Sequence, residues 1–331
     1  MTKPRIALEP LHDDYETAMR SCLAWLNLEG RLKSGGCVFV KPNLTFPVYR
    51  PGVMTTPACV EALLAAIRDC SSRIVIGEAD SGGYNRFDID NVMRKIGLVE
   101  LAKKYGATVV NLSRLPRREL TTRDAWSTVR IPFPTMLLEE MDLVISVAVP
   151  KIHMNTLVSM TVKNLWGCIP EPATRLRLHP HLGVVLREIV RRLPATVGIV
   201  DGRVGLNRSG PMLGDAVELG WLMAADDLYA ADALGCRLMR LDPKRVAHLR
   251  AGGVGRLEES AVALSADWKP LVRDQFYLKR VWTDLPGYLA FHSSALSYLG
   301  YFSPVAGVLH KLLYLFRKPF YDYEHPDRTP S

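Results

Sequence analysis

Residues 144–153 read VISVAVPKIH, and this stretch decides the fold. Six uncharged residues, most of them β-branched, form a run typical of a strand that is buried on both faces, as in a parallel sheet. The run is followed by Lys151 and His153, so the chain becomes polar where the strand leaves the core. In open α/β sheets, ligands bind beyond the carboxyl ends of the strands. The stretch therefore predicts both a sheet and a site at its edge.

The same pattern recurs along the chain. Apolar runs predict strands at residues 37–41, 73–78, 108–112, 143–149, 197–201 and 219–225. Helical spacing lies between them: Thr56 and Pro57 are typical of a helix start, and a second helix is expected at 89–105, ended by Gly106. The sequence predicts an α/β fold with a mostly parallel central sheet flanked by helices.

Composition narrows the class of protein. With 48% hydrophobic and 23% charged residues over 331 positions, the chain is typical of a globular protein and not of a disordered one. The 42 Lys and Arg against 34 Asp and Glu give a net charge of +8, which favours anionic partners. The basic residues are scattered and match no nucleic-acid module, so we expect no nucleic acid as a partner. The polar N-terminus carries no signal-peptide pattern, which predicts a cytoplasmic protein.

We expect two regions: an α/β domain at 1–265, with its core at 36–257, and an aromatic-rich helical extension at 266–331. Between residues 285 and 310 there is no Asp, Glu, Lys or Arg, but prolines, glycines and serines interrupt the stretch. Two interpretations stay open. Residues 285–316 form helices that pack on the main domain, or they lie in a membrane surface, giving a cytoplasmic protein with peripheral membrane association.

Four predicted strands end near a charged residue: Lys41, Glu78, Lys151 and Asp201. Because the carboxyl ends of parallel strands meet at one sheet edge, we expect these side chains to share one crevice. Lys41, Lys151 and Lys163 would then hold an anionic small molecule.

We expect His153, Lys163 and Lys151 to be the catalytic residues, acting as general acids or bases. His153 ordinarily titrates near neutrality, and a lysine crowded by other cations can lose its proton and act as a base or an imine-forming amine. A helix beginning near Thr156 would direct its amides at the same anion, and Ser81-Gly82-Gly83 would form a backbone nest. The expected substrate-binding residues are Lys41, Asn43, Ser81, Gly82, Thr156, Thr161, Asn164 and His179.

The sequence offers one candidate cofactor, a divalent metal ion. Glu78 and Asp201 are expected either to hold a divalent metal or to orient His153, since carboxylates with imidazoles suit Mg, Mn, Fe or Zn. The six cysteines never approach a Cys-x-x-Cys spacing, so we expect no iron–sulfur cluster within this chain. The cofactor is otherwise unknown, and neither nucleotide-binding glycine motif is present.

Three blocks, in order, carry a family resemblance: Lys-Pro-Asn at 41–43, Pro-Lys-Ile-His at 150–153 and Thr-Val-Lys-Asn-Leu-Trp-Gly at 161–167. Together with the stretch from Arg175 to His179 they resemble the domain of unknown function 362 family, over roughly residues 36–257. Many relatives carry a ferredoxin-type iron–sulfur module, which implies a redox setting, but this chain lacks that cysteine pattern. No general reaction is assigned to the family, so the resemblance names a site without naming its chemistry.

The sequence therefore predicts a cytoplasmic enzyme that acts on a carboxylate- or phosphate-bearing metabolite, in a biosynthetic tailoring step, by Lys and His acid–base chemistry. Two alternatives stay open. One is a non-catalytic or electron-transfer accessory protein that works with a separate iron–sulfur protein. The other is a peripheral membrane-surface protein.

Overall fold

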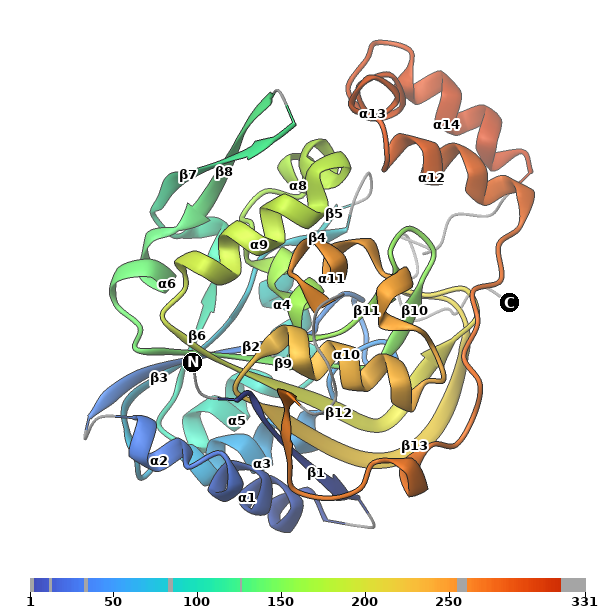
Figure 1. The fold of residues 1–331 in the computed structure, drawn as a ribbon. Helices are drawn as coiled ribbons and strands as arrows, with labels where there is room; N and C mark the ends of the chain where they lie inside the picture. The colour runs from blue at the N-terminus through green and yellow to red at the C-terminus, as the bar shows by residue number, and fades with distance from the viewer. Residues whose placement is uncertain are drawn as a thin grey trace.

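The computed structural model describes residues 3–11, 14–32, 35–82, 86–125, 127–254 and 261–316. At its centre is a sheet in the strand order β14-β1-β13-β12-β9-β2-β3-β6, to which the short strands β10 and β11 attach beside β12 (Figure 1). Its strands are β1 Arg5–Pro10, β2 Gly36–Pro42, β3 Ser71–Glu78, β6 Thr108–Asn111, β9 Leu143–Ala148, β10 Lys151–His153, β11 Leu157–Ser159, β12 Ala195–Asn207, β13 Asp215–Ala225 and β14 Ala263–Leu264.

The middle of the sheet is parallel. Strands β12, β9, β2, β3 and β6 run in one direction, and β13 pairs antiparallel with both β12 and β1. The predicted α/β fold with a mostly parallel sheet is therefore confirmed. All six predicted strands are present, whereas β1 was missed because its six residues at the N-terminus carry too short an apolar run.

Helices cover both faces of the sheet. The face toward α1 and α3 takes Val38 and Val40, while Phe39 packs into the opposite core, because successive side chains of a strand alternate in direction. The helices are α1 Tyr15–Trp25, α2 Leu28–Arg31, α3 Pro57–Ile67, α4 Ile89–Lys95, α5 Leu98–Lys104, α6 Thr135–Glu139, α7 Thr161–Asn164, α8 Pro172–Leu178, α9 Leu182–Arg192, α10 Leu228–Leu238 and α11 Ala247–Ala251.

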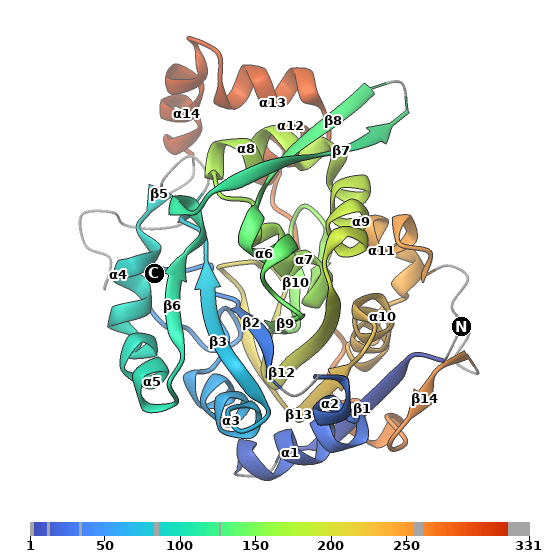
Figure 2. The ribbon, with the colours of Figure 1, turned by 90° about the vertical axis from the view of Figure 1, so that its left-hand side faces the viewer.

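Two small hairpins and several 3-10 turns complete the main body. The hairpins are β4 Ser81–Gly82 with β5 Arg86–Phe87, and β7 Arg117–Asp124 with β8 Ser127–Pro134, which projects from the body in Figure 2. The 3-10 turns are η1 Leu112–Arg114, η2 Leu165–Cys168, η3 His179–His181, η4 Pro243–Arg245, η7 Lys269–Leu271 and η8 Trp282–Asp284.

Two helix predictions need correction. The helix expected at 89–105 is interrupted at Gly97, whose left-handed φ of 76° separates α4 from α5. The helix expected to begin near Thr156 is instead the hairpin of β10 and β11, and helical structure begins at Thr161. The run from Leu157 to Ser159 pairs with β10 and is thereby held in strand conformation.

The last described part of the chain forms a helical layer, as predicted. Helices α12 Leu285–Ala290, α13 Ser294–Tyr301 and α14 Ala306–Tyr314 lie together next to α8, at the opposite end of the molecule from α1 (Figures 1 and 2). No helix in the described part of the chain is long and apolar enough to cross a bilayer. The division of the chain at residue 265 stays a prediction, and residues 317–331 of the expected extension lie outside the described residues.

Candidate functional site

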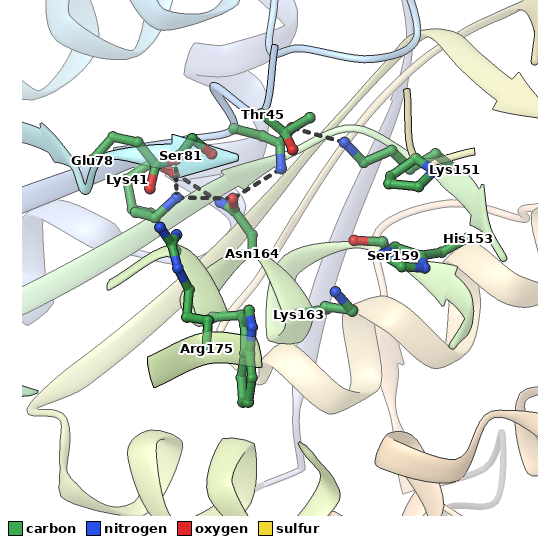
Figure 3. Close-up of a pocket in the computed structure, with 14 residues that line it drawn as sticks. Lys41, Thr45, Glu78, Ser81, Lys151, His153, Ser159, Lys163, Asn164 and Arg175 are labelled. Atoms are coloured by element: carbon green, nitrogen blue, oxygen red, sulfur yellow. Dashed lines mark hydrogen bonds and ion pairs between the residues drawn. The ribbon is translucent and has the colours of Figure 1, made fainter. Parts of the chain in front are cut away.

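A pocket with about 460 Å³ of empty space, part of it open to solvent, lies where β2, β3 and β9 end (Figure 3). The hairpin of β10 and β11, helix α7 and helix α8 supply its other walls. The lining residues that the sequence had marked are Lys41, Asn43, Glu78, Ser81, Lys151, His153, Lys163 and Asn164; those that it had not marked are Thr45, Ser159, Trp166, Gly167, Arg175 and Pro211. Distant strand ends therefore meet in one place.

Lys41 and Glu78 form a buried ion pair at neighbouring strand ends. Nζ of Lys41 lies 2.5 Å from Oε2 of Glu78, and it also donates to the carbonyl of Pro42 and to Oδ1 of Asn164. These three bonds use every N–H of the ammonium group. Lys41 is therefore committed to the protein and has no spare donor for a ligand.

Asn164 joins the strand ends to α7. Its Nδ2 donates to the carbonyl of Lys41 at 3.0 Å and to Oγ of Ser146 at 3.1 Å. Its Oδ1 accepts from Lys41 and from Nδ2 of Asn43. An amide is needed here because the position requires both a donor and an acceptor. Asn164 and Asn43 therefore act as scaffolding of the pocket wall.

Lys151 is only partly satisfied. Its Nζ donates to Oδ1 of Asn43 and to the carbonyl of Val53, both at 2.8 Å, which leaves one N–H. The side chain is 2% exposed. Burial, together with the charges of Lys163 and Lys41, lowers the pKa of Lys151 to about 7, against the opposing effect of Glu78.

Among the described residues that line the pocket, Lys163 is a cation without a partner. It is buried in α7 and lines the pocket, and within the described residues its ammonium group makes no hydrogen bond or ion pair; in Figure 3 no dashed line reaches it. Burial and the nearby Arg175 guanidinium lower the pKa of Lys163 to about 7. Three N–H groups of this side chain are thus available to a ligand.

His153 lies in the same pocket as a neutral ring. Its Nδ1 accepts the backbone N–H of Asn155 at 3.1 Å, so the neutral imidazole carries its proton on Nε2. Burial, followed by the positive charge of Lys163, holds the pKa of His153 well below its usual value. The sequence-based role rested on an ordinary pKa near neutrality. In this environment His153 is a hydrogen-bond donor through Nε2.

Gly167 allows the wall to close over the ion pair. A Cβ at this position would overlap Oε1 of Glu78 and lie 2.9 Å from Nζ of Lys41. Only a glycine permits η2 to approach the pair this closely. The glycine of the 161–167 block is therefore explained by packing against buried charge.

Arg175 and Trp166 were missed as site residues. Arg175 is 8% exposed, and its guanidinium donates to the carbonyl of Asp80 while facing the pocket. Trp166 also lines the pocket, and its ring lies 5.7 Å from that of His179. The available signal was their place in segments that carry the family resemblance: Trp166 lies in the block at 161–167, and Arg175 begins the stretch that ends at His179.

Several predicted binding residues serve the surrounding structure instead of lining the pocket. Oγ1 of Thr161 contacts Asp232 at 2.5 Å, and Oγ1 of Thr156 donates to the carbonyl of Val158. His179 packs against Phe291 of the C-terminal layer, with ring centroids 4.1 Å apart. Gly82 pairs with Arg86 in a hairpin, and Gly83 of the expected backbone nest lies outside the described residues.

Asp201 lies apart from Glu78. Its carboxylate accepts the hydroxyl of Tyr15 at 2.6 Å and the backbone N–H of Thr56 at 2.9 Å, on the sheet face that α1 and α3 cover. Strand β12 continues past Asp201 for six more residues, so this position is not a strand end. Asp201 therefore joins α1 and α3 to the sheet and does not line the pocket, whereas Glu78 does. That the two carboxylates hold a metal or orient His153 stays a prediction.

The remaining donor groups are dispersed. In the described ranges, no three His, Cys, Asp or Glu side chains are grouped as a metal site. The six cysteines are free thiols, and Cys22, Cys59, Cys168 and Cys236 are buried.

Comparisons with known proteins agree with the resemblance seen in the sequence. The chain is 27% identical over 231 residues to a thylakoid-associated protein of Synechocystis, a match that covers 66% of this chain and 68% of that protein. A crystal structure of a Thermotoga maritima protein is similar with a TM-score of 0.40 and 13% sequence identity. The match covers 65% of this chain and 57% of the Thermotoga chain. Residues 38–237 match the family described as a domain of unknown function (DUF362), and the protein belongs to this family.

Proposed function

We propose that the protein is an enzyme that binds a small carboxylate- or phosphate-bearing metabolite in this pocket and uses Lys163 to transfer a proton. One observation carries the proposal: the buried ammonium of Lys163 faces a cavity and has no partner within the described residues. An uncompensated buried charge is costly, and an anionic ligand would remove that cost.

The cationic side chains of the pocket differ in how many of their N–H groups remain free for a ligand. Lys41 is fully bonded within the protein, so the ligand's anionic group meets the spare N–H of Lys151, the free ammonium of Lys163 and the guanidinium of Arg175. Hydrogen bonds from charged donors to an anion are the strong ones. The pocket thus favours a carboxylate or a phosphate over a neutral ligand.

Proton transfer follows from the pKa of Lys163. A side chain with a pKa of about 7 is present in both protonation states at neutral pH. The ammonium form pairs with the anion and donates a proton to the bound substrate, and the neutral amine that remains takes a proton back. His153 donates its Nε2–H to an oxygen of the same ligand, which assists without itself changing charge.

The proposal is tested by isothermal titration with sulfate and with malonate at pH 7. The wild type should bind, and Lys163→Gln should bind about tenfold more weakly or worse, since a charged hydrogen bond is lost. The matched control is Lys103→Gln, which removes the same charge from an exposed helix position. Equal affinity of wild type and Lys163→Gln would remove Lys163 from the site.

A further inference from the structure

The C-terminal layer carries an unusual surface. In the described ranges 16 large apolar side chains are exposed, and 13 of them lie between residues 281 and 316; the three elsewhere are Trp25, Tyr49 and Tyr277. Single exposed apolar residues are normal, but a concentration on one element marks a surface that is covered in use.

In this layer the large apolar side chains face solvent and small side chains face the body, which is the reverse of what a surface helix normally shows. Each helix turns a small residue inward, Ala290 in α12, Ser297 in α13 and Ala306 in α14, and all three are buried. The large side chains point to solvent, among them Leu289, Leu296, Leu299, Val308 and Leu312. A helix that folds only to bury its apolar face would show the opposite arrangement.

The layer is fixed to the body by a few contacts on its inner side. The hydroxyl of Ser297 donates to the carbonyl of Leu176 at 3.2 Å, and the guanidinium of Arg177 lies 4.9 Å from the ring of Phe302. Arg280 donates to the carbonyl of Met154 at the tip of the β10–β11 hairpin. The exposed face is therefore held in place against α8 and the hairpin.

Charge identifies the occupant of this face. No Asp or Glu occurs from residue 285 to 321, whereas Lys279 and Arg280 lie exposed just before the layer and Lys311 lies exposed on α14. Helices of six to nine residues are far too short to span a bilayer, for which about 20 are needed. Short helices with outward leucines and a basic border suit the interface of an anionic membrane, where apolar side chains enter the headgroup region.

We propose that α12, α13 and α14 form a docking layer for the surface of an anionic phospholipid bilayer. Val308 and Leu312 lie one helical turn apart on the same face of α14 and enter the interface together. Lys279 and Lys311 contact the lipid phosphates. The sheet domain stays on the aqueous side.

Co-sedimentation of the full chain with vesicles tests this. The wild type should pellet with phosphatidylcholine vesicles that contain phosphatidylglycerol, and less with phosphatidylcholine alone or at high salt. The double variant Val308→Glu/Leu312→Glu should bind about tenfold more weakly or worse. The control is Trp25→Glu on α1, an exposed apolar residue at the opposite end of the molecule, which should bind like the wild type.

Folding and self-association are measured alongside. Because both mutated side chains are exposed, circular dichroism and the melting temperature should match the wild type. A wild type that stays in the supernatant with both vesicle types overturns the proposal, as does a double variant that binds unchanged. Loss of a concentration-dependent dimer in the double variant, without vesicle binding by the wild type, would assign the face to a second copy of the chain and also overturn it.

Discussion

Nζ of Lys41 lies 2.5 Å from Oε2 of Glu78, and both side chains are buried where two neighbouring strands end. The pair is neutral as a unit. Its carboxylate is the one acidic side chain among the residues described as lining the pocket, so Lys151, Lys163 and Arg175 leave the cavity positive. The affinity of the pocket for anions thus depends on cations that lie next to a neutralised pair.

Glu78→Gln should move stability and affinity in opposite directions. Removing the carboxylate leaves Lys41 buried and uncompensated, which costs about 3–5 kcal/mol of folding free energy. The more positive pocket should bind sulfate more tightly. Urea unfolding and isothermal titration measure the two effects, and weaker sulfate binding by a folded variant would contradict the account.

Lys163→Met should stabilise the protein in anion-free buffer. The lysine pKa is about 7 in the fold against 10.5 in the free side chain, so between these values the unfolded chain binds more protons and stability rises with pH. Below pH 7 the folded protein carries the full cost of the buried, charged Lys163 side chain. The variant should therefore melt about 2–6 °C higher at pH 6, and the gain should shrink toward pH 10.

Lys103→Met, at an exposed position, serves as the control and should leave this pH profile unchanged. Melting curves from pH 6 to pH 10 provide the measurement. A Lys163→Met protein that is less stable than the wild type at pH 6 would show that Lys163 has a stabilising partner.

Sulfate affinity should fall as pH rises, since sulfate itself keeps its charge over this range. An anion favours the protonated lysines, so binding takes up protons and weakens once Lys151 and Lys163 deprotonate near pH 7. Between pH 6 and pH 8 the loss is about tenfold for each lysine engaged, and about a hundredfold for both. A pH-independent dissociation constant would exclude both lysines from the contact.

Gly167→Ala should lower both stability and sulfate affinity, because Gly167 lies in the pocket wall. The added methyl group would overlap Glu78 and press on Lys41, and such overpacking costs about 1–3 kcal/mol. Gly287→Ala is the matched control, because nothing lies within 4 Å of its added Cβ. Unfolding curves and sulfate titrations of the two variants should differ, and equal behaviour would mean that the wall is not closely packed.

Asp201→Asn separates structure from binding. The substitution weakens the bond to the Tyr15 hydroxyl and the contact with the Thr56 amide, at a cost of about 1–3 kcal/mol, but Asp201 does not line the pocket. Sulfate affinity should therefore stay unchanged. A loss of affinity that exceeds the loss of stability would return Asp201 to the site.

The sequence located the sheet edge well, for a physical reason. Short β-branched runs that lead into Lys41, Glu78 and Lys151 are typical of buried strands that emerge at a polar rim, and parallel pairing brings the strand ends together. The fold class and the family followed from the same segments, and both are confirmed.

Other features were beyond the sequence because they depend on tertiary pairing. Asp201 resembled a strand end, but β12 continues as one arm of a long antiparallel ribbon, and strand alternation directs the Asp201 side chain toward α1 and α3. Thr156 resembled a helix start, but it lies in the turn between β10 and β11, which pair with each other. The low pKa of His153 comes from burial beside Lys163, which no local pattern reveals.

Diffraction from crystals soaked in selenate tests the central claim most directly, because the anomalous signal of selenium locates the anion. The account predicts selenate in the pocket at β2, β3 and β9, with an oxygen in hydrogen-bonding range of the Lys163 ammonium, and no such peak in Lys163→Gln crystals. An empty pocket in the wild type, or an equal peak in the variant, would contradict it.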